Sequence, residues 1–132
     1  MNEFGIAVSE EGQTFSVRPQ PYIPVPYTVE SDWSAASYWY ETVALSDDAE
    51  VTLTGLFVNS LQGDAHIGSL FDPLGVETVF TSNGVVLKRK ERVVDVPFVY
   101  DFTDMPDMAQ TFAITCAMLD IPSVLRLQAR TP

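Results

Sequence analysis

Two aspartates of this 132-residue chain lie where the sequence predicts that a strand gives way to a helix. Asp32 opens the helical part of segment 31–38, and Asp107 opens that of segment 106–111. A carboxylate at such a point can act as a general base or bind a hydroxyl of a small substrate. It can equally serve as a helix N-cap, because its oxygens accept hydrogen bonds from the first-turn N–H groups. The residues alone favour the cap for both aspartates, and more strongly for Asp32.

Other chemical motifs are missing from the sequence. It has no Gly-x-Ser-x-Gly, Walker or Gly-x-Gly-x-x-Gly pattern. His66 has no second His and no Cys at ligand spacing, so we expect no metal site and place this residue at the surface or at the boundary of the core. Cys116 is expected to be a small buried residue. The Gln-Gly-Asp segment at 62–64 is predicted to form a turn with a helix cap.

The charge of the chain bears on its partners. Seven basic and 18 acidic residues give a net charge of −11, which argues against nucleic acid as a partner. Four of the basic residues crowd into segment 88–92, which we interpret as a solvated strand end. No apolar run is long enough to span a membrane. A single cysteine and an N-terminus without signal-peptide character favour a cytoplasmic setting.

The hydrophobic pattern predicts a mixed α/β (α+β) fold with helices packed on a sheet. A hairpin of strands 4–8 and 13–17 with its turn at 10–12 is followed by a Pro-rich extended connector at 19–26. Helices are expected at 33–45, 65–73 and 108–119. The first should bury Ala35, Tyr38, Trp39, Thr42 and Val43, and the second Ile67, Leu70, Phe71 and Leu74. Further strands are expected at 27–30, 50–54, 76–81, 85–88, 92–96, 98–102 and 123–127, with positive φ at Gly75 and at the Asn-Gly turn of residues 83 and 84.

Four segments resemble motifs of the enolpyruvyl transferases, and among them of the 5-enolpyruvylshikimate-3-phosphate synthase family. Residues 29–38 read VESDWSAASY, similar to the family's VEGDxSSASY, and residues 59–64 read NSLQGD, similar to its NSxQGD. Residues 74–76 resemble its Met-Gly-Ala strand entry, and residues 105–111, MPDMAQT, resemble its IPDAAMT. Departures from the motifs are Ser31 for a glycine, Trp33 for a small residue, Met108 and Gln110.

The resemblance implies a two-lobed fold in which each lobe contains three βαβαββ units and the active site lies between the lobes. On this basis the chain is expected to be an interior fragment of about one and a half units with a leading hairpin. Residues 1–18 would end the preceding lobe, and residues 19–26 would cross between the lobes. Residues 27–90 would form one unit, and residues 91–132 the truncated start of the next.

The same resemblance implies an activity. The family transfers the enolpyruvyl group of phosphoenolpyruvate to the 5-hydroxyl of shikimate 3-phosphate, in the shikimate pathway of aromatic amino acid biosynthesis, with no cofactor and no metal. Asp107 maps to the aspartate that contacts the substrate hydroxyls and accepts the proton, and Asp32 is a weaker candidate for substrate binding. The family's phosphate-binding Lys and Arg residues, including its Lys-Glu-x-Asp-Arg segment, are expected outside this chain. The fragment alone should therefore be inactive.

Two alternatives stay open at this point. One is the sister enolpyruvyl transferase that acts on a UDP-sugar in cell-wall synthesis. The other is a non-catalytic α/β binding module that reuses the fold. Neither alternative nor the leading interpretation involves nucleic acid or a membrane.

Overall fold

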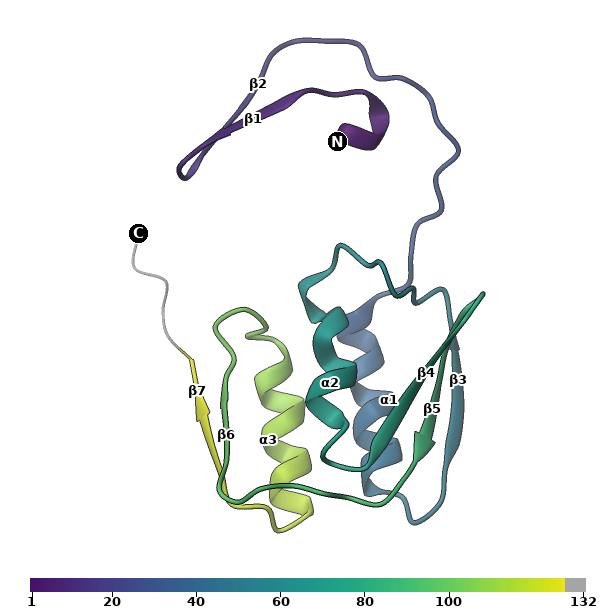
Figure 1. The fold of residues 1–132 in the computed structure, drawn as a ribbon, viewed down its shortest axis with the longest axis vertical. Coiled ribbons are helices and arrows are strands. Elements are labelled where there is room, and N and C mark those ends of the chain that lie inside the picture. Colours follow the sequence, from purple (N-terminus) through teal and green to yellow (C-terminus); the bar gives the residue numbers. More distant parts are fainter. Residues whose placement is uncertain (128–132) are drawn as a thin grey trace.

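The computed structural model describes residues 1–127, which form a helical body and a small hairpin beyond one of its ends (Figure 1). Three helices occupy the middle of the body, and a 3-10 turn leads into the second. They are α1 (Trp33–Leu45), η2 (Gly63–His66) with α2 (Ile67–Phe71), and α3 (Met108–Met118). The three predicted helices are confirmed to within a few residues. The last five residues of the predicted segment 91–132 lie outside the described residues.

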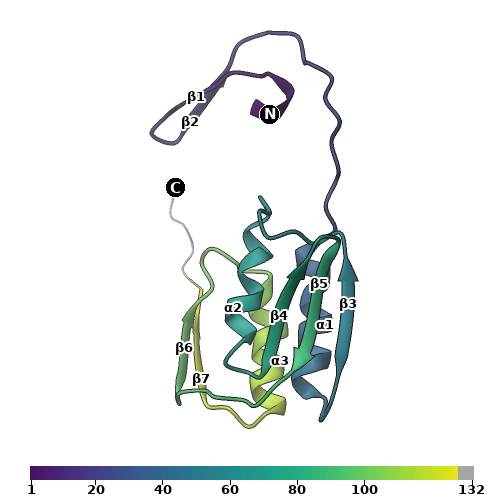
Figure 2. The same cartoon turned by 45° about the vertical axis from the view of Figure 1, so that its right-hand side comes forward.

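Two sheets flank the helices. The antiparallel sheet has the order β3 (Glu50–Thr54), β5 (Gly84–Arg89), β4 (Val76–Thr81), and the parallel pair consists of β6 (Phe98–Asp101) and β7 (Ser123–Arg126). Helix α1 packs on β3 and β5, α3 packs on β7, and α1 and α3 contact each other. The helices therefore separate the two sheets (Figures 1 and 2). This arrangement confirms the predicted mixed α/β fold.

Aromatic side chains from helices and strands fill the space between the two sheets. The ring of Phe112 in α3 lies 5.5 Å from that of Phe71 in α2 and 5.1 Å from that of Phe98 in β6. All four side chains predicted to form the buried face of the second helix are buried, as is Cys116. Burial of such large apolar side chains supplies most of the free energy that holds the layers together.

The buried face of α1 differs from the prediction. Tyr38 and Trp39 are 65% and 49% exposed, whereas Trp33 and Tyr40 are completely buried. Of the five residues predicted to be buried, only Val43 is. Helix α1 is apolar on nearly all sides, so the 3.6-residue period fits more than one face. The polar Ser37 belongs to the buried face because its hydroxyl donates to the Ser34 carbonyl at 2.7 Å.

The N-terminal hairpin forms, with a shifted turn. After the 3-10 turn η1 (Asn2–Phe4), β1 (Val8–Glu11) pairs with β2 (Thr14–Val17). The predicted strand at 4–8 is therefore wrong except at Val8. The turn consists of residues 12 and 13, because Gly12 adopts a φ of +61° there. The Pro-rich segment 19–26 contains neither helix nor strand, as predicted, and connects the hairpin to the body.

Two predicted strands are absent from the described residues. Segment 27–30 has strand-like residues but no neighbouring strand. The next residue, Ser31, is bound to the body, because its N–H donates to the Gly55 carbonyl at 2.7 Å. Segment 92–96 is also irregular. A short β-prone sequence forms a strand only when a partner strand completes its hydrogen bonds.

The hairpin between β4 and β5 has a different turn from the expected one. Thr81 pairs with Gly84, so the two turn residues are Ser82 and Asn83. In the described part of the chain the only non-glycine residue with positive φ is Asp120, so Asn83 does not adopt the predicted conformation. Gly84 is needed because a Cβ atom there would lie 2.0 Å from the Leu53 carbonyl oxygen. Gly75 has the predicted positive φ, +90°, in the turn after α2.

Candidate functional site

All three helices begin at the end of the body that faces the N-terminal hairpin (Figure 1). Asp32 precedes α1 and Asp107 precedes α3, so both predicted site residues lie at this end. The segment 59–66, which leads into α2, lies there as well. The N-terminal ends of helices carry partial positive charge and stabilise nearby anions. We call this end of the body the helix-start face.

Asp32 acts as a helix cap. Its Oδ1 accepts a hydrogen bond from the Ser34 N–H at 2.8 Å, and its backbone has the extended conformation of an N-cap residue. The Asp32 side chain is exposed. The cap predicted for this residue is confirmed, and it accounts for Asp32 without a substrate.

Asp107 is different, although it occupies the equivalent position in α3. Its side chain forms no capping hydrogen bond, and its φ of −68° and ψ of −24° are already helical. The turn into α3 is held by backbone bonds instead, with the Met108 N–H donating to the Met105 carbonyl at 3.1 Å. The predicted cap at Asp107 is therefore wrong, because a residue with helical backbone angles does not direct its side chain to the first-turn N–H groups. The exposed carboxylate remains available to a ligand.

The segment 59–64 is tied to the start of α1 by side chains. Gln62 Oε1 accepts from the Trp33 N–H at 2.9 Å, and Gln62 Nε2 donates to the Ser31 carbonyl at 2.8 Å. The Ser60 hydroxyl donates to Glu30 Oε1 at 2.8 Å. Two of the sequence motifs thus form one hydrogen-bonded unit. The turn predicted at 62–64 is present, since the Ala65 N–H donates to the Gln62 carbonyl at 3.2 Å, but no side chain caps η2 or α2, so the predicted cap is wrong.

A series of hydrogen bonds made by serine and threonine hydroxyls continues from this unit to α3. The Ser34 hydroxyl donates to Asp64 Oδ2, and the Ser37 hydroxyl donates to the Ser34 carbonyl at 2.7 Å. The hydroxyl oxygens of Ser37 and Thr111 lie 3.4 Å apart, and both residues are buried. Sequence reasoning missed the roles of Ser34, Gln62 and Asp64. The signal was present, because all three belong to two of the four motifs that carried the resemblance.

A hollow of about 270 Å³ opens at the helix-start face between two loops, segment 59–66 and segment 102–107, which leads from β6 into α3. It is lined by Gly63, His66, Ser69, Tyr100, Asp104 and Met105. Burial raises the pKa of Tyr100, and the negative charges of Asp104 and Asp101 raise it further. Hydrogen bonds from the Thr103 hydroxyl (2.5 Å) and the Thr103 N–H (2.9 Å) lower the pKa of the Asp101 carboxyl. His66 is exposed, as predicted.

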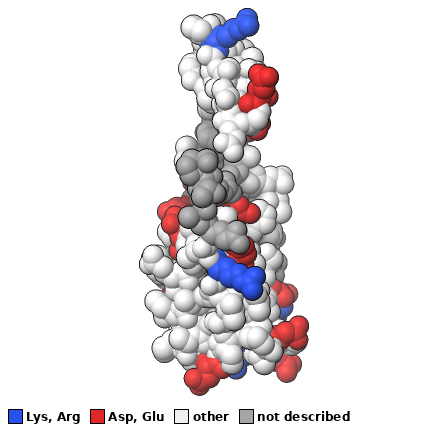
Figure 3. Space-filling model, turned by 90° about the vertical axis from the view of Figure 1, so that its left-hand side faces the viewer, with Lys and Arg blue, Asp and Glu red and all other residues white. Residues whose placement is uncertain are grey.

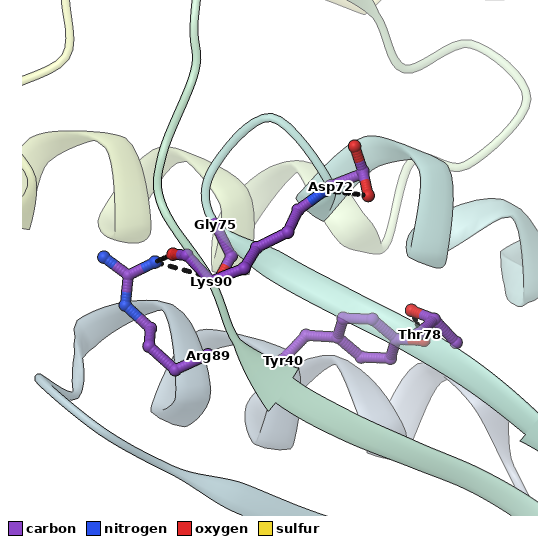
Figure 4. Close-up of polar contacts among 6 residues, drawn as sticks. All are labelled: Tyr40, Asp72, Gly75, Thr78, Arg89 and Lys90. Carbon is purple, nitrogen blue, oxygen red and sulfur yellow. Dashed lines mark hydrogen bonds and ion pairs between the residues drawn. The ribbon is translucent and has the colours of Figure 1, made fainter.

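Most of the basic side chains among residues 1–127 lie away from the helix-start face. Arg89 donates to the Gly75 carbonyl at 2.8 Å and to the Lys90 carbonyl (Figure 4). It also donates to the Ser46 carbonyl at 3.0 Å, at the end of the body where α1 ends. Lys90 pairs with Asp72. The 13 residues of α1 place this cluster roughly 20 Å from the helix starts. Arg126 differs, because it ends β7 and its charge contributes to lowering the pKa of the Asp101 carboxyl. On the side of the body bearing β6 and β7, a basic side chain and several acidic ones border a mainly uncharged area (Figure 3).

Comparison with known proteins identifies the family. A family model described as EPSP synthase (3-phosphoshikimate 1-carboxyvinyltransferase) matches residues 1–130. The chain belongs to the EPSP synthase family. The resemblance inferred from the sequence motifs is therefore confirmed.

Relatives within the EPSP synthase family come from distant groups of organisms. A 3-phosphoshikimate 1-carboxyvinyltransferase from Bacteroides fragilis is 50% identical over 123 residues, which cover 92% of this chain and 30% of the relative. A protein of that name from Methanosphaerula palustris is 32% identical, with 95% of this chain and 29% of the relative covered. The chloroplastic protein from Petunia hybrida is 34% identical, with 96% and 26% covered. The chain spans about 30% of the length of the curated relatives it matches.

Two further observations concern the described residues only. None of their helices combines the length and the apolar character needed to cross a membrane. They contain no group of three or more His, Cys, Asp or Glu side chains arranged to hold a metal ion.

Proposed function

We propose that this chain is part of a 3-phosphoshikimate 1-carboxyvinyltransferase, which transfers the enolpyruvyl group of phosphoenolpyruvate to the 5-hydroxyl of shikimate 3-phosphate. The observation that carries this proposal is the family match over residues 1–130. The names of relatives from a bacterium, an archaeon and a plant support it. They also favour this activity over the UDP-sugar branch of the enolpyruvyl transferases. The family match over nearly the whole chain also favours this activity over a non-catalytic binding module.

In the proposed reaction Asp107 is the catalytic base. As the 5-hydroxyl oxygen adds to the phosphate-bearing carbon of phosphoenolpyruvate, the Asp107 carboxylate takes the hydroxyl proton, and the electron pair of the C=C bond takes up a proton at the methylene carbon. In the subsequent elimination the resulting methyl group loses a proton, the C=C bond forms again and phosphate leaves. Asp107 would also bind the neighbouring substrate hydroxyls. The exposure of this carboxylate and the lack of a capping bond support the role, since capping does not account for the residue. General base assistance of this kind contributes typically about 10²- to 10⁴-fold in rate.

For Asp32 we propose an organising role at the start of α1. One of its oxygens already accepts the Ser34 N–H. Direct substrate binding by Asp32 stays a prediction without structural support.

The two phosphate groups of the proposed substrates need cations, and this chain supplies few near Asp107. Its net charge is −11, and Arg89 is engaged with three backbone carbonyls. We propose that the phosphate-binding Lys and Arg residues belong to the part of the relatives that this chain does not cover.

Replacing Asp107 by Asn in the full-length protein tests the proposal, with phosphate release from the two substrates as the measurement. Turnover should fall by about 10²-fold or more, because an amide cannot accept the proton. Asp47→Asn is a matched control, since the same charge is removed in the bend beyond the far end of α1. Turnover by Asp107→Asn equal to that of the control would reject Asp107 as the base. Absence of turnover in the unmodified full-length protein would reject the activity itself.

A further inference from the structure

The hydrogen bonds of segment 59–64 are not used by the proposed reaction, and they converge on the start of α1. Gln62 holds both neighbours of Asp32, through the Trp33 N–H at 2.9 Å and the Ser31 carbonyl at 2.8 Å. A single side chain therefore fixes the position of segment 59–64 relative to the first turn of α1. The Ser60 hydroxyl reinforces this link, because it accepts from the Gln62 N–H at 3.0 Å.

Asp64 makes the second connection, through hydroxyl groups. It accepts from Ser34, whose carbonyl accepts from Ser37 at 2.7 Å, and Ser37 lies 3.4 Å from the Thr111 hydroxyl. Thr111 belongs to the first turn and a half of α3. Ser37 and Thr111 are 1% and 5% exposed, so this contact is shielded from water.

Gly63, between the two anchoring residues, makes the third connection. A Cβ atom at this position would lie 3.5 Å from the Asp104 carbonyl oxygen, so the gap between segment 59–64 and the residues before Asp107 is here only about as wide as a methyl group. The Asp104 carbonyl is three residues before Asp107, in a turn closed by the Met105 N–H, which donates to the Phe102 carbonyl at 3.0 Å. The same two loops line the hollow of the helix-start face.

We propose that Gln62 and Asp64 are positioning residues for Asp107. They join segment 59–64 and the first turn of α1 into one block, and the loop and helix start that carry Asp107 pack against this block. This inference rests on the proposed function, since it presumes that Asp107 takes the proton. Neither residue is expected to touch the reacting atoms.

The first test compares Asp64→Ala with Asp72→Ala in the full-length protein. Loss of the bond from Ser34 should lower kcat about tenfold, because small displacements of a catalytic group are costly, while the KM for phosphoenolpyruvate stays within about twofold. Asp72→Ala also replaces a carboxylate by a methyl group, and it removes only the exposed pair with Lys90. Its kcat should not change. Asp64→Asn keeps an acceptor oxygen for Ser34 and should restore most of the lost kcat.

A second variant separates loss of the Ser34–Asp64 hydrogen bond from misfolding caused by Asp64→Ala. Ser34→Ala deletes one hydroxyl and leaves Asp64 in place, and it should lower kcat in the same direction if Asp64 acts through Ser34. Thermal unfolding identifies any variant that is not folded. Normal kcat in folded Asp64→Ala, Ser34→Ala and Gln62→Ala would overturn the proposal.

The decisive measurement combines Asp64→Ala with Asp107→Asn. If Asp64 acts by positioning Asp107, its replacement should lower the residual rate of Asp107→Asn less than about twofold, compared with about tenfold in the unmodified protein. Equal factors in both backgrounds would reject positioning while leaving the catalytic role of Asp107 intact. Normal turnover by Asp107→Asn alone would instead reject Asp107 as the base, and absence of turnover in the unmodified protein would reject the proposed activity.

Discussion

Asp32 and Asp107 occupy the same position at two helix starts, yet only Asp32 caps its helix. Asp32→Ala should therefore lower the free energy of unfolding by about 1 kcal/mol, because the Ser34 N–H loses its acceptor. Asp107→Ala should change the free energy of unfolding by less than half as much. Urea unfolding of both variants in the full-length protein measures the difference. A larger loss for Asp107→Ala would show that its carboxylate has a structural partner in solution.

Tyr40 makes stability depend on pH in the alkaline range. Burial raises the pKa of Tyr40 to about 12, although the hydrogen bond with Thr78 (2.9 Å) opposes this shift (Figure 4). The neutral phenol is thus favoured in the folded state, so its contribution is complete below pH 10 and is lost as the pH rises through about 12. The loss amounts to roughly 2 to 3 kcal/mol.

Comparison with Tyr40→Phe isolates this effect, since phenylalanine cannot ionise. Unfolding by urea at about pH 9 and about pH 11.5 should show a steeper loss of stability in the unmodified protein than in the variant. At the lower pH the variant should be less stable by about 1 kcal/mol, because the Thr78 hydroxyl loses its partner. Parallel pH curves would mean that Tyr40 remains neutral or is solvated throughout.

The sequence identified the important residues at the helix-start face better than their roles. Asp32 and Asp107 were both predicted to lie at helix starts, and they do. Their capping differs through backbone angles that residue type does not determine. Gln62 and Asp64 were recognised as part of a motif, but their bonds join segments about 30 residues apart. Local spacing carries no information on such contacts.

Secondary structure elements were predictable where local chemistry decides them. Helix α1 begins at the residue after its cap, and strand β3 has the predicted bounds. The buried face of α1 was not predictable, because it depends on the contact with α3 at Ser37 and Thr111. The absent strands at 27–30 and 92–96 have the same cause, since strand formation needs a partner from elsewhere in the chain.

The β4–β5 hairpin depends on one glycine for a reason of space. At Gly84 a Cβ atom would lie 2.0 Å from the Leu53 carbonyl oxygen, and φ is +153°. Gly84→Ala should cost more than about 3 kcal/mol, because strand β3 would have to move away. Gly12→Ala is the control, since its φ is +61° but nothing lies within 4 Å of the new Cβ atom. It should cost only about 1 kcal/mol in thermal or urea unfolding. Similar losses of stability for the two variants would show that strand β3 can move away from the new Cβ atom at little cost in free energy.

At the scale of the whole molecule, two parts of the chain are joined by one extended segment. The N-terminal part holds the start of this segment, since the Ile23 N–H donates to the Phe4 carbonyl at 2.9 Å. The hairpin lies beyond the end of the body at which the helices begin (Figure 2). We propose that residues 1–18 and 19–26 belong to a second lobe and a crossing between lobes, as the sequence motifs predicted. In that arrangement Asp107 would face the space between the lobes.

The distribution of charge leads to a prediction for the 132-residue chain studied in isolation. Shikimate 3-phosphate is a multiply charged anion, and its phosphate needs Lys or Arg side chains. The chain has a net charge of −11, and four of its seven basic residues lie in segment 88–92. There Lys88 and Lys90 pair with Glu50 and Asp72, while Arg89 binds backbone carbonyls. Helix starts alone provide only a weak attraction for anions.

Titration calorimetry with shikimate 3-phosphate should therefore give no affinity tighter than about 1 mM for the isolated chain, equivalent to about 4 kcal/mol of binding free energy. The full-length protein, measured in the same buffer, should bind measurably tighter because it adds the missing cations. Circular dichroism before each titration ensures that the isolated chain is folded. Micromolar affinity of the folded isolated chain would contradict the argument, since the helix-start face would then hold a phosphate without Lys or Arg from outside.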